Sequence, residues 1–167
     1  LCIYAQINWA PSFMIRVFGW SPEDTSNFLL ISSVIGATSA FSVGWMMAWL
    51  IGKGHSDAPM IACLIHGACS LILGPLAYLA VNTPMMMVFY LSLSFTSNWS
   101  TSAALMGVSQ ITPNQLRGKM VAFYTMLSGL ISLSAGAYFV GLLSDKVFTE
   151  PTGIKYSLGV VYAVSGG

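Results

Sequence analysis

Residues Ser92–Ser102 read SLSFTSNWSTS and place seven hydroxyl side chains, an Asn and a Trp inside a segment that otherwise resembles a membrane-spanning helix. A helix turns by about 100° per residue, so a helix over residues 85–108 gathers polar side chains on one face. Unpaired polar groups are costly in lipid, and we expect this face to contact protein or water. Thr96 and Ser100 are predicted to point away from this face, so their substitution would serve as an internal control for substitutions on it. The polar face comprises Tyr90, Ser94, Ser97, Asn98 and Thr101.

The composition of the whole chain indicates a polytopic membrane protein. Of 167 residues, 56% are hydrophobic and 7% are charged, whereas soluble domains carry about 25% charged residues. The six basic and five acidic residues nearly balance and form no basic run, which argues against a nucleic-acid partner. The lipid bilayer is the partner that this composition implies. We expect an integral, multi-pass protein of a bacterial inner (plasma) membrane.

Six apolar segments separated by short polar connections each predict a membrane helix. The predicted fold is therefore an all-α membrane protein, a six-helix bundle. The chain begins without Met and stops within its last apolar segment. We therefore expect a piece of a longer protein, with the first helix partly truncated and the last one truncated. The segments cover residues 1–18, 28–51, 60–80, 85–108, 120–143 and 157–167.

The six segments show a weak internal repeat, with three helices in residues 1–80 and three, the last truncated, in residues 85–167. Each triplet begins with a polar-faced helix, and Tyr4 and Asn8 share such a face in the first. An odd number of spans makes the two triplets enter the membrane in opposite directions. The second helix of each triplet has small residues at four-residue intervals, which predict close helix packing. They are Gly36, Ala40 and Gly44, and then Ser132 and Gly136.

Three stretches carry a family pattern: Trp9-Ala10-Pro11-Ser12-Phe13 with Arg16, Gln110-Ile111-Thr112-Pro113 followed by Leu116-Arg117-Gly118, and Gly141-Leu142-Leu143-Ser144-Asp145. In these stretches, and along nearly the whole chain, the sequence resembles the major facilitator superfamily and, within it, the spinster-like branch. The resemblance implies the C-terminal half of a twelve-helix transporter with 3+3 inverted repeats. Its partner would be the N-terminal six-helix half, which is missing here. Two motifs depart from the family: Gly44-Trp45-Met46-Met47 lacks the acidic–basic pair that usually follows, and Gly136-Ala137 replaces a Gly-Pro.

The resemblance implies that the first and fourth helices line a central substrate cavity. The substrate-binding residues would then be Tyr4, Asn8, Tyr90, Ser94, Asn98 and Thr101. The alternative is that the hydroxyl side chains bond to carbonyls one turn earlier, or across helices, and hold the bundle together. For Arg117 we expect a role at the cytoplasmic gate, in a loop whose turn is fixed by Pro113 and Gly118. The Lys and Arg count of the loops gives no orientation, because it is equal on both sides.

These features together predict a carrier for a small organic or amphipathic solute, secondary active or facilitative, that works by alternating access. No catalytic residue, metal or cofactor is expected. The alternatives are an intramembrane enzyme and a pore or scaffold. A serine protease is disfavoured because Gly107-Val108-Ser109 is followed by Gln110, with no His later in the chain. No Asp or Glu lies within a predicted span, so proton coupling through this part of the protein has little support.

Overall fold

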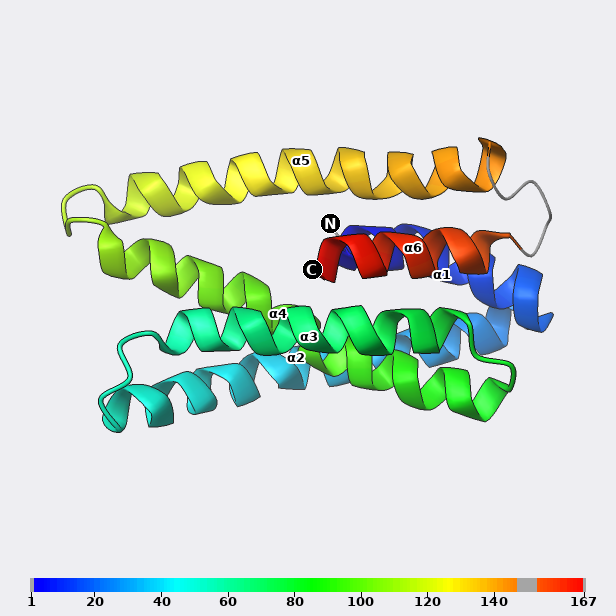
Figure 1. Cartoon of the computed structure of the whole chain (residues 1–167), viewed down its shortest axis with the longest axis horizontal. Helices are drawn as coiled ribbons and strands as arrows, with labels where there is room; N and C mark the ends of the chain where they lie inside the picture. Colours follow the sequence, from blue (N-terminus) through cyan, green and yellow to red (C-terminus); the bar gives the residue numbers. More distant parts are fainter. Residues whose placement is uncertain (1, 147–152, 167) are drawn as a thin grey trace.

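The computed structural model describes residues 2–146 and 153–166, and these residues form six α-helices and no strand (Figure 1). The all-α prediction is thereby confirmed. In Figure 1, α2, α3 and α4 lie together along one side, α5 runs along the opposite edge, and α1 and α6 lie between them. The helices are α1 (Cys2–Phe18), α2 (Pro22–Gly52), α3 (Ala58–Tyr78), α4 (Thr83–Ile111), α5 (Arg117–Lys146) and α6 (Ile154–Gly166).

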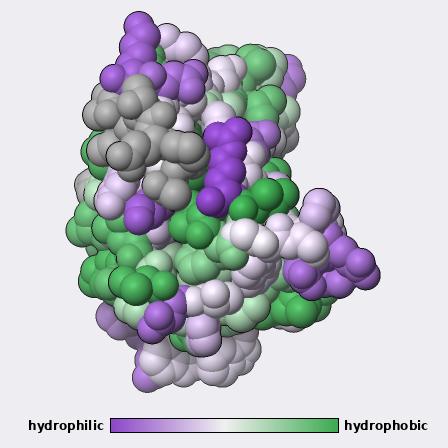
Figure 2. All heavy atoms as spheres, turned by 90° about the vertical axis from the view of Figure 1, so that its right-hand side faces the viewer, coloured by the Kyte–Doolittle hydropathy of each residue, from purple (hydrophilic) through white to green (hydrophobic). Residues whose placement is uncertain are grey.

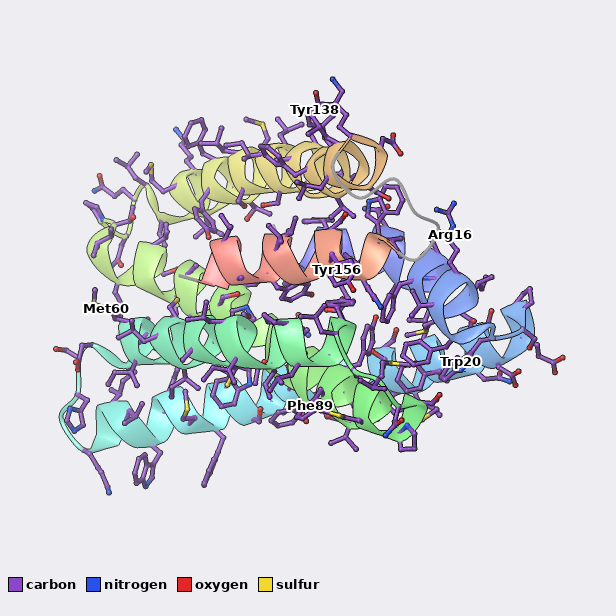
Figure 3. All side chains as sticks on the ribbon, turned by 45° about the vertical axis from the view of Figure 1, so that its right-hand side comes forward. Arg16, Trp20, Met60, Phe89, Tyr138 and Tyr156 are labelled. Atoms are coloured by element: carbon purple, nitrogen blue, oxygen red, sulfur yellow. The ribbon has the colours of Figure 1, made fainter. Side chains whose placement is uncertain are left out.

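Three of these helices, α2, α3 and α5, are long and apolar enough to cross a membrane by length and composition. This fits an integral membrane protein. Helix α4 is also long, with 29 residues, but the polar stretch in its middle keeps it out of this group. The view onto one end of the bundle in Figure 2 shows hydrophilic residues gathered in patches, with hydrophobic surface along the flanks. Arg16 belongs to this end and points away from the bundle (Figure 3).

Helices α2 to α6 all begin before the residue that the sequence predicted, and local bonding explains this for α2 and α5. Helix α2 starts at Pro22, where Ser21 caps it by accepting a hydrogen bond from the Asp24 backbone N–H at 3.0 Å. A capping Ser followed by Pro and two acidic residues favours this start. Helix α5 starts at Arg117, so the expectation of a loop at Arg117 and Gly118 is wrong. The preceding turn is short because the Leu116 N–H bonds to the carbonyl of Pro113 at 2.9 Å, which aligns the chain for helix.

Aromatic side chains from several helices fill the larger core. Tyr78 of α3 makes edge-on contact with Phe13 of α1, with ring centroids 5.0 Å apart, and also packs on Tyr90 of α4. Tyr162 of α6 lies 5.2 Å from the Tyr78 ring. Helix α6 can approach α3 this closely because residue 74 is Gly: a Cβ there would lie 2.6 Å from the Cβ of Tyr162. Helix α6 therefore packs on α3 at a position where no residue larger than Gly fits.

Helix α5 is the most exposed of the long helices. Within it only Gly136 and Val140 are buried. Its main polar anchor is Trp9 of α1, whose indole Nε1 donates to the carbonyl of Ala137 at 3.2 Å. Tyr138, which is 66% exposed, projects from the outer face of α5 (Figure 3). The outer face of this helix is therefore available to lipid or to another helix.

The small residues of α2 do not share one packing surface. Gly36 is buried against α4, where a Cβ would lie 3.5 Å from the Ser94 carbonyl oxygen. Ala40 and Gly44 are exposed. Residues four apart are rotated by about 40° around a helix, so Gly44 lies about 80° from Gly36. The expectation of a single stripe along Gly36, Ala40 and Gly44 therefore requires correction.

Candidate functional site

A buried hydrogen-bond network centred on Ser94 joins helices α1, α2 and α4. The Ser94 hydroxyl donates to the Tyr90 carbonyl one turn earlier, at 2.9 Å. With its proton directed there, the same oxygen accepts from Gln6 Nε2 at 3.0 Å and from the Ser32 hydroxyl at 2.8 Å. All three side chains are buried. Ser94 thus satisfies the polar side chains of two neighbouring helices inside an apolar bundle.

Gln6 extends this network to the last helix. Its Oε1 accepts a hydrogen bond from the Tyr162 hydroxyl at 2.9 Å. Gln6 and Ser32 were not among the residues predicted to be functional. An amide in the middle of an apolar segment was the available signal for Gln6. No sequence signal distinguished Ser32, because it is one of several hydroxyl residues on α2. Only the packing of α2 against α4 brings it, rather than another of them, to Ser94.

Asn98 forms a further hydrogen bond between helices. Its Nδ2 donates to the carbonyl of Gly36 on α2 at 2.7 Å. A pocket of about 420 Å³ lies beside this contact, between α1, α2 and α4, and we call it the α2 pocket. Tyr90, Ser94 and Asn98 all line it. Ser94 and Asn98 already have protein partners, so their hydrogen bonds hold α4 against α1 and α2. This agrees with the alternative interpretation of the polar face, in which its side chains hold the bundle together.

A second pocket, which we call the α5 pocket, has a volume of about 380 Å³ and lies between α1, α4 and α5, with Cys63 of α3 at one side. Two predicted residues line it, Tyr4 and Thr101. Helix α5 contributes Tyr124, which sequence reasoning missed because α5 showed no polar face. The hydroxyl side chains of the α5 pocket are those of Tyr4, Ser100, Thr101, Tyr124, Thr125, Ser128 and Ser132.

These hydroxyl groups differ in whether they are already bonded. Thr125 and Ser128 donate to carbonyls of their own helix, at 2.8 and 3.2 Å, and Ser132 also has a partner. Within residues 2–146 and 153–166, the hydroxyls of Tyr4, Ser100, Thr101 and Tyr124 make no hydrogen bond to protein. Four donors and acceptors therefore remain for a bound molecule, and the α5 pocket is the stronger candidate for a ligand site.

The structure does not bring the six predicted substrate residues into one site. Tyr90, Ser94 and Asn98 line the α2 pocket, and Tyr4 and Thr101 line the α5 pocket. Asn8 is exposed, and its Nδ2 donates to the Tyr4 carbonyl of its own helix at 2.8 Å. The expectation that Ser100 points away from Thr101 and could be a control is wrong, because both line the α5 pocket. Two residues in succession can reach one pocket when it is wide and several helices enclose it.

Neither pocket carries a charged side chain among its lining residues. In the part of the chain that the structure describes, no three His, Cys, Asp or Glu side chains are grouped so that they could hold a metal ion. His66 lies on α3 with its Nε2 3.3 Å from the Ser70 hydroxyl. This His–Ser pair lies one helical turn apart on a single helix. All three gate candidates are exposed: Pro113 lies in the α4–α5 turn, and Arg117 and Gly118 are the first residues of α5.

Comparison of the chain with family models, curated proteins and solved structures finds no match. The functional argument therefore depends on the chemistry of the two pockets.

Proposed function

We propose that this chain is the substrate-translocating half of a membrane carrier that works by alternating access. The observation that supports it most is the α5 pocket, a space of about 380 Å³ that is lined by four unbonded hydroxyl groups from α1, α4 and α5. A merely structural cluster would bond these groups to one another or to backbone, as happens around Ser94. Groups that a bundle leaves unpaired are suited to a transient ligand.

The proposed partner is a second six-helix half, together with which the chain would form a twelve-helix transporter of the major facilitator type. The resemblance described above supports this arrangement, as does the exposed apolar surface of α5. Rocking of the two halves would expose the α5 pocket to one side of the membrane at a time. Helix α5 is suited to such movement because only two of its residues, Gly136 and Val140, are buried.

The test is exchange transport by the protein translated from the complete reading frame and reconstituted in vesicles. Entry of labelled solute is measured for a panel of sugars, amino acids, organic anions and lysolipids. For at least one of them, we expect entry to be faster when the vesicles are preloaded with the same solute in unlabelled form. A pore would pass solute without this acceleration. A protein that moves none of the panel, although correctly inserted, would refute the proposal, as would a reading frame that adds no further membrane helices.

Variants of the α5 pocket connect that activity to the site. Thr101→Val removes an unbonded hydroxyl at nearly constant volume and is expected to lower exchange while membrane insertion stays normal. Thr38→Val is the matched control, because the Thr38 hydroxyl is exposed on α2 and bonds to Ile35 of its own helix at 2.7 Å. Equal exchange by the two variants would show that the α5 pocket is not the transport site.

A further inference from the structure

We infer that the α5 pocket binds an uncharged, polyhydroxylated ring solute of about monosaccharide size. This inference rests on the proposed carrier function and specifies its substrate class. It follows from three properties of the pocket: the absence of charged lining residues, the excess of unbonded hydroxyl groups and the size of the space.

Charge is the first property. The α5 pocket is lined by hydroxyl, thiol and apolar side chains, and none of its lining residues is Asp, Glu, Lys, Arg or His. The ten charged residues that the structure describes lie in helix termini or in the connections between helices. An ion transferred from water into such a site would lose hydration without gaining a counter-ion, which is costly. The lining that this chain supplies therefore offers no counter-ion to an anion or a cation.

The unbonded hydroxyls are the second property. Tyr4, Ser100, Thr101 and Tyr124 come from three helices, so they approach the space from different sides. A hydroxyl group both donates and accepts, and it therefore pairs with the hydroxyls of a polyol in either direction. A hydrocarbon chain in the same space would offer none of these four groups a hydrogen-bond partner, which disfavours a purely apolar ligand. The rings of Tyr4 and Tyr124 add apolar faces that suit the C–H surface of a sugar ring.

Size is the third property. A volume of about 380 Å³ lies at the lower end of the range of ligand pockets, about 300–1,000 Å³. It suits a single sugar ring better than an oligosaccharide or a two-chain lipid. Gly129 contributes to the space on the α5 side, where no atom lies within 4 Å of a Cβ built on it.

Three probes that share one ring and differ in charge test the inference. Radiolabelled glucose, glucosamine and glucuronate are neutral, cationic and anionic near pH 7. Their binding is measured on the reconstituted complete protein by equilibrium dialysis at pH 7. We expect glucose to bind about tenfold or more tightly than either charged analogue. Tyr124→Phe should weaken glucose binding about twofold to tenfold, whereas Thr38→Val should leave it unchanged.

A charge placed in the pocket provides the sharper test. In Thr101→Asp, the new carboxylate should make glucosamine the preferred probe, since it supplies the missing counter-ion. Thr101 is exposed, so this variant is expected to fold. A wild-type preference for glucuronate or glucosamine would overturn the inference, and so would glucose binding that neither pocket variant alters.

The outcome of the transport panel separates this inference from the carrier proposal. If the protein exchanges other solutes but binds none of the three probes, the substrate class is wrong and the carrier function stands. If it exchanges nothing, the carrier function fails, and this inference fails with it.

Discussion

Replacement of Gly74 by Ala should destabilise the bundle through its closest helix contact. A Cβ at residue 74 would lie 2.6 Å from the Cβ of Tyr162, although real Cβ atoms essentially never come within 3.0 Å of a neighbour. The opposing atom is fixed to the α6 backbone, so no side-chain rotation relieves the overlap and the two helices must separate. Overpacking costs about 1–3 kcal/mol, and loss of the Tyr162 bond to Gln6 would add about 0.5–1.5 kcal/mol. We expect a total loss of about 1.5–4.5 kcal/mol.

The free energy of unfolding is measured on the complete protein by titrating mixed micelles with dodecyl sulfate and following tryptophan fluorescence. Gly44→Ala is the matched control, because no atom lies within 4 Å of a Cβ built at that exposed position of α2. It should leave stability unchanged or raise it by up to about 1 kcal/mol. If Gly74→Ala unfolds at the same detergent composition as this control, the close approach of α3 and α6 does not exist in the protein.

Three further predictions use the same unfolding measurement. Ser94→Ala leaves two buried partners without their acceptor and should cost about 1–3 kcal/mol, whereas a change within error would mean that the central network does not form. Trp9→Phe removes the bond to the Ala137 carbonyl at 3.2 Å, which should lower the free energy of unfolding by about 0.5–1.5 kcal/mol. It should also speed hydrogen exchange in α5, and unaltered exchange would contradict the role of Trp9 as an anchor. Ser21→Ala removes the cap on the Asp24 N–H and should lower the free energy of unfolding by about 0.5–2 kcal/mol. Fraying should be confined to the first turn of α2, and fraying elsewhere would argue against the cap.

The sequence was sufficient to locate the helices, because runs of apolar residues broken by turn residues determine where a chain can form them. The boundaries were less accurate where local bonding decided them. Ser21 and Pro22 start α2 before its apolar run begins, and the Pro113 turn lets α5 start at Arg117. A boundary prediction based on apolarity alone overlooks such caps, since the first turn of these helices is polar.

The candidate site was harder to predict, because it depends on how each helix is rotated against its neighbours. Periodicity showed that Ser94, Asn98 and Thr101 lie roughly on one side of α4. It gave no information on which neighbour each would meet, and in the structure Asn98 bonds to α2 whereas Thr101 faces the α5 pocket. Tyr124 escaped prediction for the related reason that a residue on a mostly apolar helix gains its polar neighbours only through packing.

The contact between Gln6 and Tyr162 joins residues 156 positions apart in the chain. Ser94 is synthesised 88 positions after Gln6, so the amide nitrogen of Gln6 acquires its partner well before the amide oxygen does. At about 5–20 residues per second, the interval between Gln6 and Tyr162 is about 8–30 s of translation. During that time the Gln6 amide of α1 is incompletely paired, so the network that joins α1 to α6 is completed only after the last helix has been synthesised.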